Sequence, residues 1–572
     1  MKFAVRPYRF EAKDGRAVEA ELGSLAVPMN RSEPGRGTVQ LAFVRLPASV
    51  AKPGPPIVFL NGGPGLSGIE SARGRLFAMF EAFCATADVV LLDQRGSGFS
   101  TPSLACDDAL VLPFDRVLSK ADVLRALDES TRRCAERLRK SGVDLSAFNT
   151  SESADDVADL AGALGAESVS LLAWSYGTHL AFAVLRRHES IVARVVLAAP
   201  EGPDHTYKLP SRIQRQLESL SDRARAATPK SPKLVASMRA VLEQVEREPV
   251  RIPWSDSDPQ AAVVGRFDLE WTTAQGIGDT RILSRLPRWY ARMARGNFGD
   301  IARDRVLRAY FEELRTGMNR SLVRTCMDCA SGATAERWRR IENEARTTLL
   351  GRTADFPFPE ICDAIGNPDL GDGFRAPVRS SKEVLFITGT LDARTPADNV
   401  AELAPGFSRH RHLVVEDAGH SDLLFPAAAQ RAIAGFFSSG EVENERVRVE
   451  PSFRFEHDRP VLLYDGECGF CLRQVERLRA RVGDAVAFEA YQEAHWVNIR
   501  KENLAQSVHL VDGDGSVSSG TEAVFRTLAA GGKHRLLYSM YRRLPAFAAV
   551  SEAVYRWIAR HRGRLARVFP RS

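Results

Sequence analysis

The chain lacks any long apolar run. None of its 572 residues lies in an uninterrupted stretch of about 18 uncharged apolar residues, the length that crosses a bilayer. We therefore expect no membrane span. The first residues, MKFAVRPYRFEAKDGRAVEAELG, hold no apolar segment of secretory length and no small-residue cleavage site. They predict no signal peptide and a soluble, cytoplasmic protein.

The chain also has little excess charge. Its net charge is +6, without the strong basic clustering that is typical of nucleic-acid binders, so we expect no nucleic-acid partner. No repeat with a period of about 20 to 50 residues stands out, which excludes a solenoid or propeller. Hydrophobic residues make up 44% of the chain, enough for a large core and two or three domains.

Cysteine is sparse but patterned, since two pairs have C-x-x-C spacing. In a cytoplasmic protein, cysteines outside reactive motifs are typically buried apolar residues or reduced thiols, and we expect this of the first six. No metal site is predicted, because the two C-x-x-C pairs lie far apart and neither has an H-x-x-x-H partner. The eight are Cys84, Cys106, Cys134, Cys326, Cys329, Cys362, Cys468 and Cys471.

Three strand-like runs each end in a glycine-rich turn. Residues 58–60 precede NGGPG, residues 88–92 precede DQRGSG, and residues 168–172 precede AWSYG. Helical patterns such as ADDVADLAGALG separate them. Strands that alternate with helices predict an α/β fold with a doubly wound parallel sheet. Ligands of such sheets bind beyond the carboxyl ends of the strands, where all three turns would lie.

The pattern changes near residue 205 and again near residue 376. Between them, residues 205–375 are rich in Arg, Glu and Ala at helical spacing, which predicts a helical cap inserted over the sheet. The sheet-bearing core would then be split into residues 1–204 and 376–437. A polar, charged linker follows at 438–458, and a second domain occupies 459–572.

Ser175 is the candidate nucleophile. It lies in Ala173-Trp174-Ser175-Tyr176-Gly177, which matches the G-x-S-x-G nucleophile elbow with Ala in the first position. A serine on a sharp strand-to-helix turn needs small flanking residues, and the helix N-terminus beyond it favours developing negative charge. The alternative is an ordinary strand-turn-helix that happens to contain serine.

Backbone N–H groups near Ser175 would form an oxyanion hole. Gly62 and Gly63 follow the first strand, where a backbone without side chains can approach a substrate oxygen. Tyr176, directly after the nucleophile, would supply the remaining donor. Taken alone, NGGPG is equally compatible with a plain turn.

The acid and the base are expected after later strands. Asp392 follows the run Phe386-Ile387, and His420 lies in a Gly-His turn shortly after another strand. Asp417 is a rival acid, but three residues from His420 it is better placed to shape the turn. The order Ser, Asp, His is that of α/β hydrolases. The expected chemistry is acyl transfer through Ser175, with His420 as base and Asp392 orienting it.

Taken together, these motifs resemble the prolyl iminopeptidase and tripeptidyl aminopeptidase group of α/β hydrolases over residues 15–437. The family usually has His where Asn61 stands. The resemblance rests on LNGGPG (60–65), DQRGSGFS (93–100), AWSYGTH (173–179), EGPDHTYKLPS (201–211), GTLDARTP (389–396) and AGH (418–420).

The resemblance implies peptide substrates with a free N-terminal amine, which acidic residues under the cap would capture. Glu201 is the first candidate and Glu270, beside Trp271, the second; the alternative for each is a solvated glutamate. An esterase or amidase acting on small acyl substrates would use the same triad. The family also implies a disulfide between Cys106 and Cys134, and it suggests another between Cys329 and Cys362.

A second chemistry is expected after residue 460. Cys468 and Cys471 form a C-x-x-C at the head of a helix, which lowers the pKa of the first thiol. The pattern D-x-x-C-x-x-C resembles the DCC family of thiol-disulfide oxidoreductases over residues 459–568. This implies a thioredoxin-like fold, Cys468 as attacking thiol, Cys471 as resolving thiol and a thiol or disulfide partner, without a cofactor.

Two further alternatives stay open for this C-terminal part. The cysteine pair could be unreactive or bind a metal. The redox unit could also be the functional part of the chain, with the hydrolase a non-catalytic module. The arginine-rich end could touch anionic lipid or a partner, although a solvated helix face is more typical. It contains Arg556, Arg560, Arg562, Arg564 and Arg567.

Overall fold

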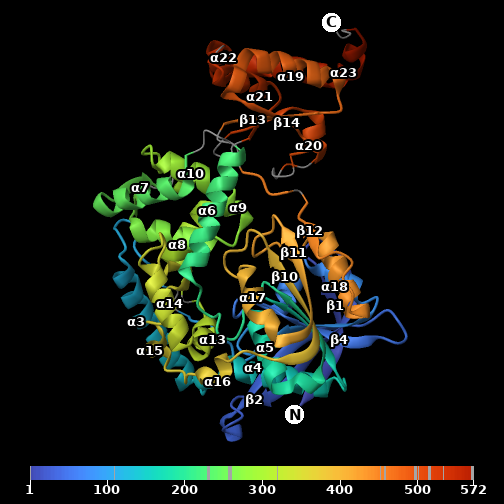
Figure 1. Ribbon diagram of the computed structural model, residues 1–572. Helices are drawn as coiled ribbons and strands as arrows, with labels where there is room; N and C mark the ends of the chain where they lie inside the picture. Colours follow the sequence, from blue (N-terminus) through green and yellow to red (C-terminus); the bar gives the residue numbers. More distant parts are fainter. Residues whose placement is uncertain are drawn as a thin grey trace. The chain divides into compact units, whose positions relative to one another are not determined.

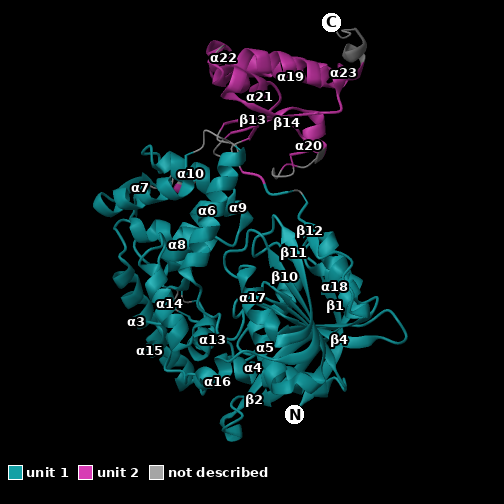
Figure 2. Ribbon diagram, viewed as in Figure 1, with its two compact units in different colours: residues 1–298, 306–453 teal, residues 299–305, 454–572 magenta. Residues whose placement is uncertain are grey.

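The computed structural model divides the chain into two compact units. The first comprises residues 1–298 and 306–453, and the second comprises 299–305 and 454–572 (Figure 2). The residues that the structure describes are 2–107, 110–227, 232–254, 261–318, 320–450, 452–455, 459–494, 499, 501–512, 517–532 and 534–568. Among them, no helix is both long and apolar enough to cross a membrane.

The first unit is built on a ten-stranded sheet in the order β1-β2-β3-β5-β4-β6-β7-β10-β11-β12. The strands from β5 to β12 in that order pair in parallel, whereas β1, β2 and β3 pair antiparallel. The doubly wound sheet predicted from the sequence is therefore confirmed. The strands are β1 (Phe3–Glu11), β2 (Ala17–Pro28), β3 (Thr38–Leu46), β4 (Gly54–Leu60), β5 (Ala87–Asp93), β6 (Val169–Trp174), β7 (Val192–Ala198), β10 (Ser380–Gly389), β11 (Phe407–Glu416) and β12 (Arg446–Arg448).

Helices cover both faces of this sheet (Figure 1). One apolar core joins the sheet to α4 (Thr150–Ala163) and α5 (Tyr176–His188), and the other joins it to α2 (Phe77–Phe83) and α18 (Ala427–Ser439). β5 is buried along its whole length because both of its faces are covered, which explains its unbroken apolar run. A short helix, α1 (Gly68–Ala72), follows the NGGPG turn.

The predicted cap region consists of helices and one hairpin, which lie beside the sheet (Figure 1). Its apolar core also takes Val123 and Leu127 from α3 (Lys120–Lys140), a helix that precedes the nucleophile in sequence. The elements are α6 (Pro210–Ala227), α7 (Leu234–Arg247), β8 (Val250–Pro253), β9 (Ala261–Val264), α8 (Arg266–Gly276), α9 (Thr280–Leu283), α10 (Leu286–Met293), α12 (Arg305–Glu312), α13 (Val323–Ser331), α14 (Ala335–Ala345), α15 (Cys362–Ile365) and α16 (Gly371–Arg375), and α17 (Asp398–Leu403) follows β10; α11 (Asp300–Arg303) is counted with the second unit.

The segment expected to be a linker, 438–458, is partly structured. Its residues Arg446–Arg448 form β12, which pairs in parallel with β11 at Val414–Glu416. The first unit accordingly extends to Phe453. A three-residue edge strand with alternating charge is too short to give a periodic signal, which is why the sequence pattern indicated only a linker.

The second unit has a mixed four-stranded sheet in the order β14-β13-β15-β16. β13 pairs in parallel with β14 and antiparallel with β15, and β15 pairs antiparallel with β16. This βαβαββα arrangement is the thioredoxin-like topology. The elements are β13 (Val461–Tyr464), α19 (Gly469–Val482), β14 (Ala487–Ala490), α20 (Lys501–Gln506), β15 (His509–Val511), β16 (Val517–Ser519), α21 (Gly520–Ala530), α22 (Arg535–Arg543) and α23 (Pro545–Val568).

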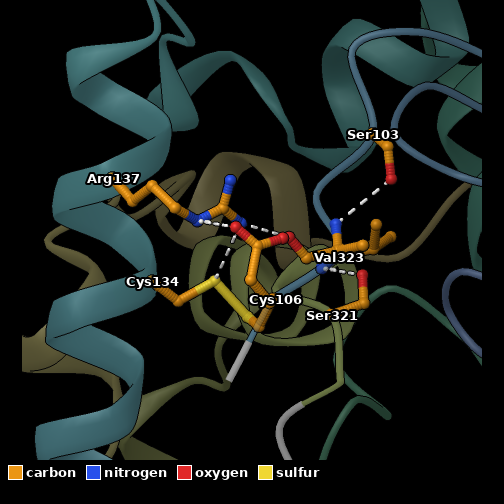
Figure 3. The surroundings of a disulfide bond; sticks show 8 residues. Ser103, Cys106, Cys134, Arg137, Ser321 and Val323 are labelled. Atoms are coloured by element: carbon orange, nitrogen blue, oxygen red, sulfur yellow. Dashed lines mark hydrogen bonds and ion pairs between the residues drawn. A yellow bond between two sulfur atoms is a disulfide. The ribbon is translucent and has the colours of Figure 1, made fainter. Parts of the chain in front are cut away.

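Two disulfides lie in the first unit, one of them within the cap. Cys106 bonds Cys134 of α3 beside Arg137 (Figure 3). Arg137 donates to the carbonyl of Ala105. The other disulfide joins α13 to α15. Cys84 and Cys326 are free. The expectation of reduced thiols is thus wrong for four of the first six cysteines. The pairings that the family resemblance implied, Cys106 with Cys134 and Cys329 with Cys362, are both present. Such bonds are typical of oxidising compartments and are rare in the cytoplasm, where the sequence led us to expect this protein.

We predict that the disulfide between Cys329 and Cys362 stabilises the cap. The double variant Cys329→Ala/Cys362→Ala should lose about 2–4 kcal/mol of unfolding free energy, because the bond closes a loop with a sequence separation of 33. Thermal unfolding in the absence of reductant measures the change, with Cys84→Ala as the control for losing a free cysteine. Equal melting of the two proteins would contradict the prediction.

Candidate active site

Ser175 sits on a strained turn between β6 and α5. Its φ is 56° and its ψ is −125°, a conformation that residues other than glycine rarely adopt. The turn is held because the Ser175 N–H donates to the carbonyl of Ala198 on the neighbouring strand, at 2.9 Å. A Cβ at position 177 would lie 1.9 Å from the carbonyl oxygen of Leu60, so Gly177 is required there. The serine is thereby raised above the strand ends.

His420 and Asp392 line up behind this serine. His420 Nε2 lies 2.8 Å from Ser175 Oγ, and His420 Nδ1 lies 2.9 Å from Asp392 Oδ2. The indole N–H of Trp174 donates to the His420 carbonyl at 3.3 Å, which ties the histidine loop to the elbow. The rival acid Asp417 instead has φ of 62° and pairs with Arg223, so it shapes the turn.

Asp392 is fully buried and held by its own loop. The N–H groups of Arg394 and Thr395 donate to Oδ1, and the Thr395 hydroxyl donates to Oδ2 at 2.7 Å. Burial favours a raised pKa for Asp392, but the positive charge and hydrogen bond of His420 and the Thr395 bonds outweigh it and leave the pKa lowered. A carboxylate that stays ionised beside the histidine can stabilise an imidazolium cation.

The NGGPG turn is held by hydrogen bonds and lies in close contact with Ser175. Gln94 donates to the Asn61 carbonyl at 2.8 Å, and the Asn61 amide donates to Ser67 and Ser71. A Cβ at Gly62 would meet Ser175 Cβ at 2.9 Å, which explains the need for glycine. However, the Gly62 N–H donates to Asn61 Oδ1 at 2.9 Å. The expectation that Gly62 donates to an oxyanion is therefore corrected: the neighbouring side chain takes that hydrogen.

The arginine of DQRGSG is a structural residue. Arg95 is fully buried, forms two hydrogen bonds of 2.7 Å with Asp156 on α4, and donates to the carbonyls of Met29 and Ala147. Removing one partner of such a buried pair typically costs about 3–5 kcal/mol. This motif thus anchors the turn at 93–98, from which Gln94 supports the loop beside the serine.

A cavity of about 250 Å³ opens at Ser175 and His420, and three acidic side chains line it. Glu201 contacts Lys208 Nζ at 2.6 Å, and Asp328 contacts Arg324 at 3.2 Å. Asp355 Oδ1 accepts from the Lys208 N–H, while its buried Oδ2 has no hydrogen-bond partner among the described residues. Lys208, Arg324 and Arg394 also line the cavity, so its lining carries both charges, and Asp355 Oδ2 is its carboxylate oxygen without a partner among the described residues.

The pKa values of these acids differ. Burial raises the pKa of Asp328 to about 6, against the opposing charge of Arg324. Burial likewise raises the pKa of Asp355 to about 6. For Glu201, burial is outweighed by the charges of Lys208 and His179, and the pKa is lowered. A cationic ligand that reached Asp355 would favour its ionised form.

Of the two glutamates expected to capture an amine, the structure brings only Glu201 to the cavity. Glu270 lies on α8, where Arg266 holds it at 2.6 Å, and it does not line the cavity. Its expected role is therefore not supported. Asp328 and Asp355 were not predicted, because they come from cap segments without a recognisable motif and meet Ser175 only through folding.

The second unit places both thiols at the start of α19. Cys468 is the N-cap residue, and its sulfur accepts from the Cys471 N–H at 3.3 Å. Burial, and then the hydrogen bond with Cys468, raise the pKa of Cys471 to about 12. Cys471 also lines a separate, mostly apolar cavity of about 380 Å³ within this unit. The Cys471 thiol thus resists ionisation.

Asp465 stands beside the thiol pair. One carboxylate oxygen accepts from Gln492 at 2.9 Å, and the other contacts Arg562 at 3.3 Å. Ligand atoms of Asp465, Cys468 and Cys471 lie within 4.8 Å of one another. A structural zinc site needs four protein ligands, and this group supplies three, one already engaged by cation and amide. The arrangement is better suited to a dithiol that cycles with its disulfide.

Comparison with known proteins assigns both units. The model of the alpha/beta hydrolase fold family matches residues 55–427, and that of the DCC1-like thiol-disulfide oxidoreductases matches residues 462–568. The serine protease Hip1 of Mycobacterium tuberculosis is 30% identical over 190 residues, which cover 32% of this chain and 36% of Hip1. The match thus spans about a third of the length of that relative.

Solved structures match the first unit more loosely. A proline iminopeptidase-related protein from Thermus thermophilus is 16% identical, with a TM-score of 0.30, over 73% of this chain and 96% of that one. A thermophilic esterase from Thermogutta terrifontis is 17% identical, with a TM-score of 0.32, over 73% and 98%. Scores this low carry no argument about substrates. On the family match over most of its length, the chain belongs to the α/β hydrolase family, with a C-terminal DCC1-like domain.

Proposed function

We propose that the chain is a serine hydrolase that cleaves residues from the N-termini of peptides through an acyl-enzyme. The observation that carries this proposal is the position of three carboxylates in the cavity that opens at Ser175. The similarity to a serine protease supports a peptide substrate. The match covers only part of that relative, so the substrate class rests mainly on the chemistry of the cavity.

The reaction follows from the distances at the serine. His420 Nε2 takes the proton of Ser175 Oγ as the oxygen attacks the scissile carbonyl. The N–H groups of Gly63 and Tyr176 stabilise the oxyanion. Gly62 does not take part, because its N–H donates to Asn61. His420 then protonates the leaving amine, and water activated by the same histidine hydrolyses the acyl-enzyme. Asp392 stabilises the imidazolium throughout.

A free N-terminal ammonium group matches the polar side of the cavity. Asp355 Oδ2 lacks a hydrogen-bond partner among the described residues, and an ammonium supplies the missing donor together with a charge. Asp328 and Glu201 already hold cationic partners, which leaves Asp355 as the carboxylate that an ammonium would pair with. A neutral acyl substrate would leave Asp355 unsatisfied, so an esterase or amidase is the second choice.

The requirement for a free amine tests this proposal. Aminoacyl and peptidyl anilides should be cleaved at least about a hundredfold faster, in kcat/KM, than the same compounds with an acetylated amine. The loss arises because the blocked compound leaves Asp355 buried without a cation. Ser175→Ala serves as the control for background hydrolysis. Equal rates on free and blocked substrates would favour the esterase.

The dependence on pH should identify the amine-binding carboxylate. Because the pKa values of Asp355 and Asp328 are raised to about 6, these groups ionise as the pH rises through that value. The ratio of kcat/KM for free over blocked substrate should therefore rise between pH 5 and pH 7, and taking the ratio removes pH effects that both substrates share.

Asp355→Asn should flatten this rise and lower the ratio roughly tenfold to a hundredfold at pH 7. Asp363→Asn, an exposed residue on α15, is the matched control. A ratio that stays constant with pH in the wild type, or a rise that persists in Asp355→Asn, would remove Asp355 from this role.

For the second unit we propose thiol-disulfide exchange. Cys468 attacks a partner disulfide and forms a mixed disulfide with it. Cys471 then loses its proton and attacks the Cys468 sulfur, which releases the partner as a dithiol and leaves the Cys468–Cys471 disulfide. The position of Cys468 at the helix N-terminus and the burial of Cys471 support this order of events.

Two variants separate these roles. Cys468→Ser should abolish reduction of a small disulfide substrate by the prereduced protein, because no attacking thiolate remains. Cys471→Ser should instead accumulate the mixed disulfide on Cys468, detected by intact mass. Cys84→Ser is the control. Full exchange by Cys468→Ser, or no trapped adduct in Cys471→Ser, would refute the assignment.

A further inference from the structure

The last helix of the second unit presents an apolar stripe to solvent. The stripe residues follow the spacing i, i+3, i+4, i+7, i+8, i+11, which places them on one face of α23. The relative exposure is 64% for Val550, 52% for Val554 and 57% for Trp557. Leu536 and Leu544, just before the helix, are exposed as well. The stripe comprises Ala546, Ala549, Val550, Ala553, Val554 and Trp557, all exposed.

The stripe is exposed although α23 is firmly packed against the rest of its unit. On the inward face of α23, the Tyr555 hydroxyl accepts from the Val508 N–H at 2.9 Å. The Ser551 carbonyl accepts from the Thr521 hydroxyl at 3.0 Å. Ile558 lines the apolar cavity of this unit. One face of α23 therefore builds the domain, and the opposite face is left as an outer surface.

Positive charge is concentrated in the same segment. Residues 533–572 contain ten lysine and arginine residues and one acidic residue, Glu552, whereas the whole chain has a net charge of only +6. Glu552 is engaged inward, because Tyr541 and the Thr521 N–H donate to it. Arg556 and Arg560 are exposed on the same turns as Trp557. An apolar face bordered by arginines is typical of a helix that lies on a membrane surface.

We propose that α23 docks this protein on the surface of a bilayer that contains anionic lipids. The valines and the Trp557 ring would enter the boundary between headgroups and acyl chains, where tryptophan is favoured. Arg556 and Arg560 would reach the anionic headgroups with their guanidinium groups and lie along the surface with their aliphatic stems.

Charge favours an anionic bilayer over a second copy of the chain or the hydrolase unit as the binding partner of the stripe. A second copy would bring an equally basic segment against the first, which like charges oppose. Residues 1–453 hold 59 lysine and arginine and 59 acidic residues, so the hydrolase part of the chain has no net negative charge to match the basic segment. An anionic bilayer supplies both an apolar layer and negative charge. Because Arg562 of the same helix contacts Asp465, docking would hold the thiol pair near the membrane surface.

Vesicle flotation of the full chain tests the proposal. The protein should float with vesicles of phosphatidylcholine and phosphatidylglycerol in a 7:3 ratio at about 0.1 M salt, and stay at the bottom with phosphatidylcholine alone. Binding should fall strongly at about 0.5 M salt, because salt screens the headgroup charge. Flotation is measured on the oxidised and the reduced protein, so that the thiol state is not a hidden variable.

Variants on the exposed face separate apolar from charged contributions. Val554→Ser/Trp557→Ser should lower the partition coefficient at least about tenfold. Arg556→Gln/Arg560→Gln should lower it about thirtyfold on anionic vesicles. Val111→Ser and Arg125→Gln, exposed residues of the first unit, are the matched controls and should bind as the wild type does. Melting temperatures confirm that each variant folds.

Several outcomes would overturn the proposal. One is the absence of flotation with anionic vesicles. Another is equal binding to neutral and anionic vesicles that survives the arginine variants. Loss of a dimer in Val554→Ser/Trp557→Ser, seen by sedimentation without any lipid binding, would assign the stripe to a second copy. Loss of protease resistance between the units in that variant, again without lipid binding, would assign it to the hydrolase unit.

Discussion

The backbone at Ser175 is the constraint around which the first unit is organised. A serine with φ of 56° is tolerated only where its surroundings prevent relaxation. Here the neighbouring strand accepts its N–H, Gly177 packs against the end of β4, and Gly62 packs against the Ser175 side chain. Together these contacts hold the backbone of the turn in place. The result is a hydroxyl 2.8 Å from His420, at the edge where the parallel strands end.

The support of this turn extends well beyond the serine. Gln94 holds the loop that carries Gly62, and Arg95 anchors the Gln94 segment to α4 through Asp156. A motif that resembles a catalytic signature is thus largely a scaffold. Asn61 also acts on the site, because its side chain takes the Gly62 N–H and reduces the set of oxyanion donors.

Local signals were enough to predict the sheet and the residues that the structure brings together at Ser175, because each of them follows a strand and sits in a short turn. The same reasoning missed Asp328 and Asp355, which come from the cap and approach the serine only through long-range packing. It misplaced Glu270, whose neighbour Arg266 is one helical turn away and satisfies it. Cysteine usage alone indicated reduced thiols for four cysteines that are paired in the structure, whereas the family resemblance implied both of these pairings correctly. β12 was not predicted, because it is short and highly charged.

Ser175 should react as an activated nucleophile, which labelling with a fluorophosphonate probe measures. We expect a single covalent adduct, located on Ser175 by peptide mass spectrometry. The adduct should be absent from Ser175→Ala and much slower to form in His420→Ala, because the base is lost. A wild-type protein that stays unlabelled, or peptide hydrolysis that persists undiminished in Ser175→Ala, would contradict the account.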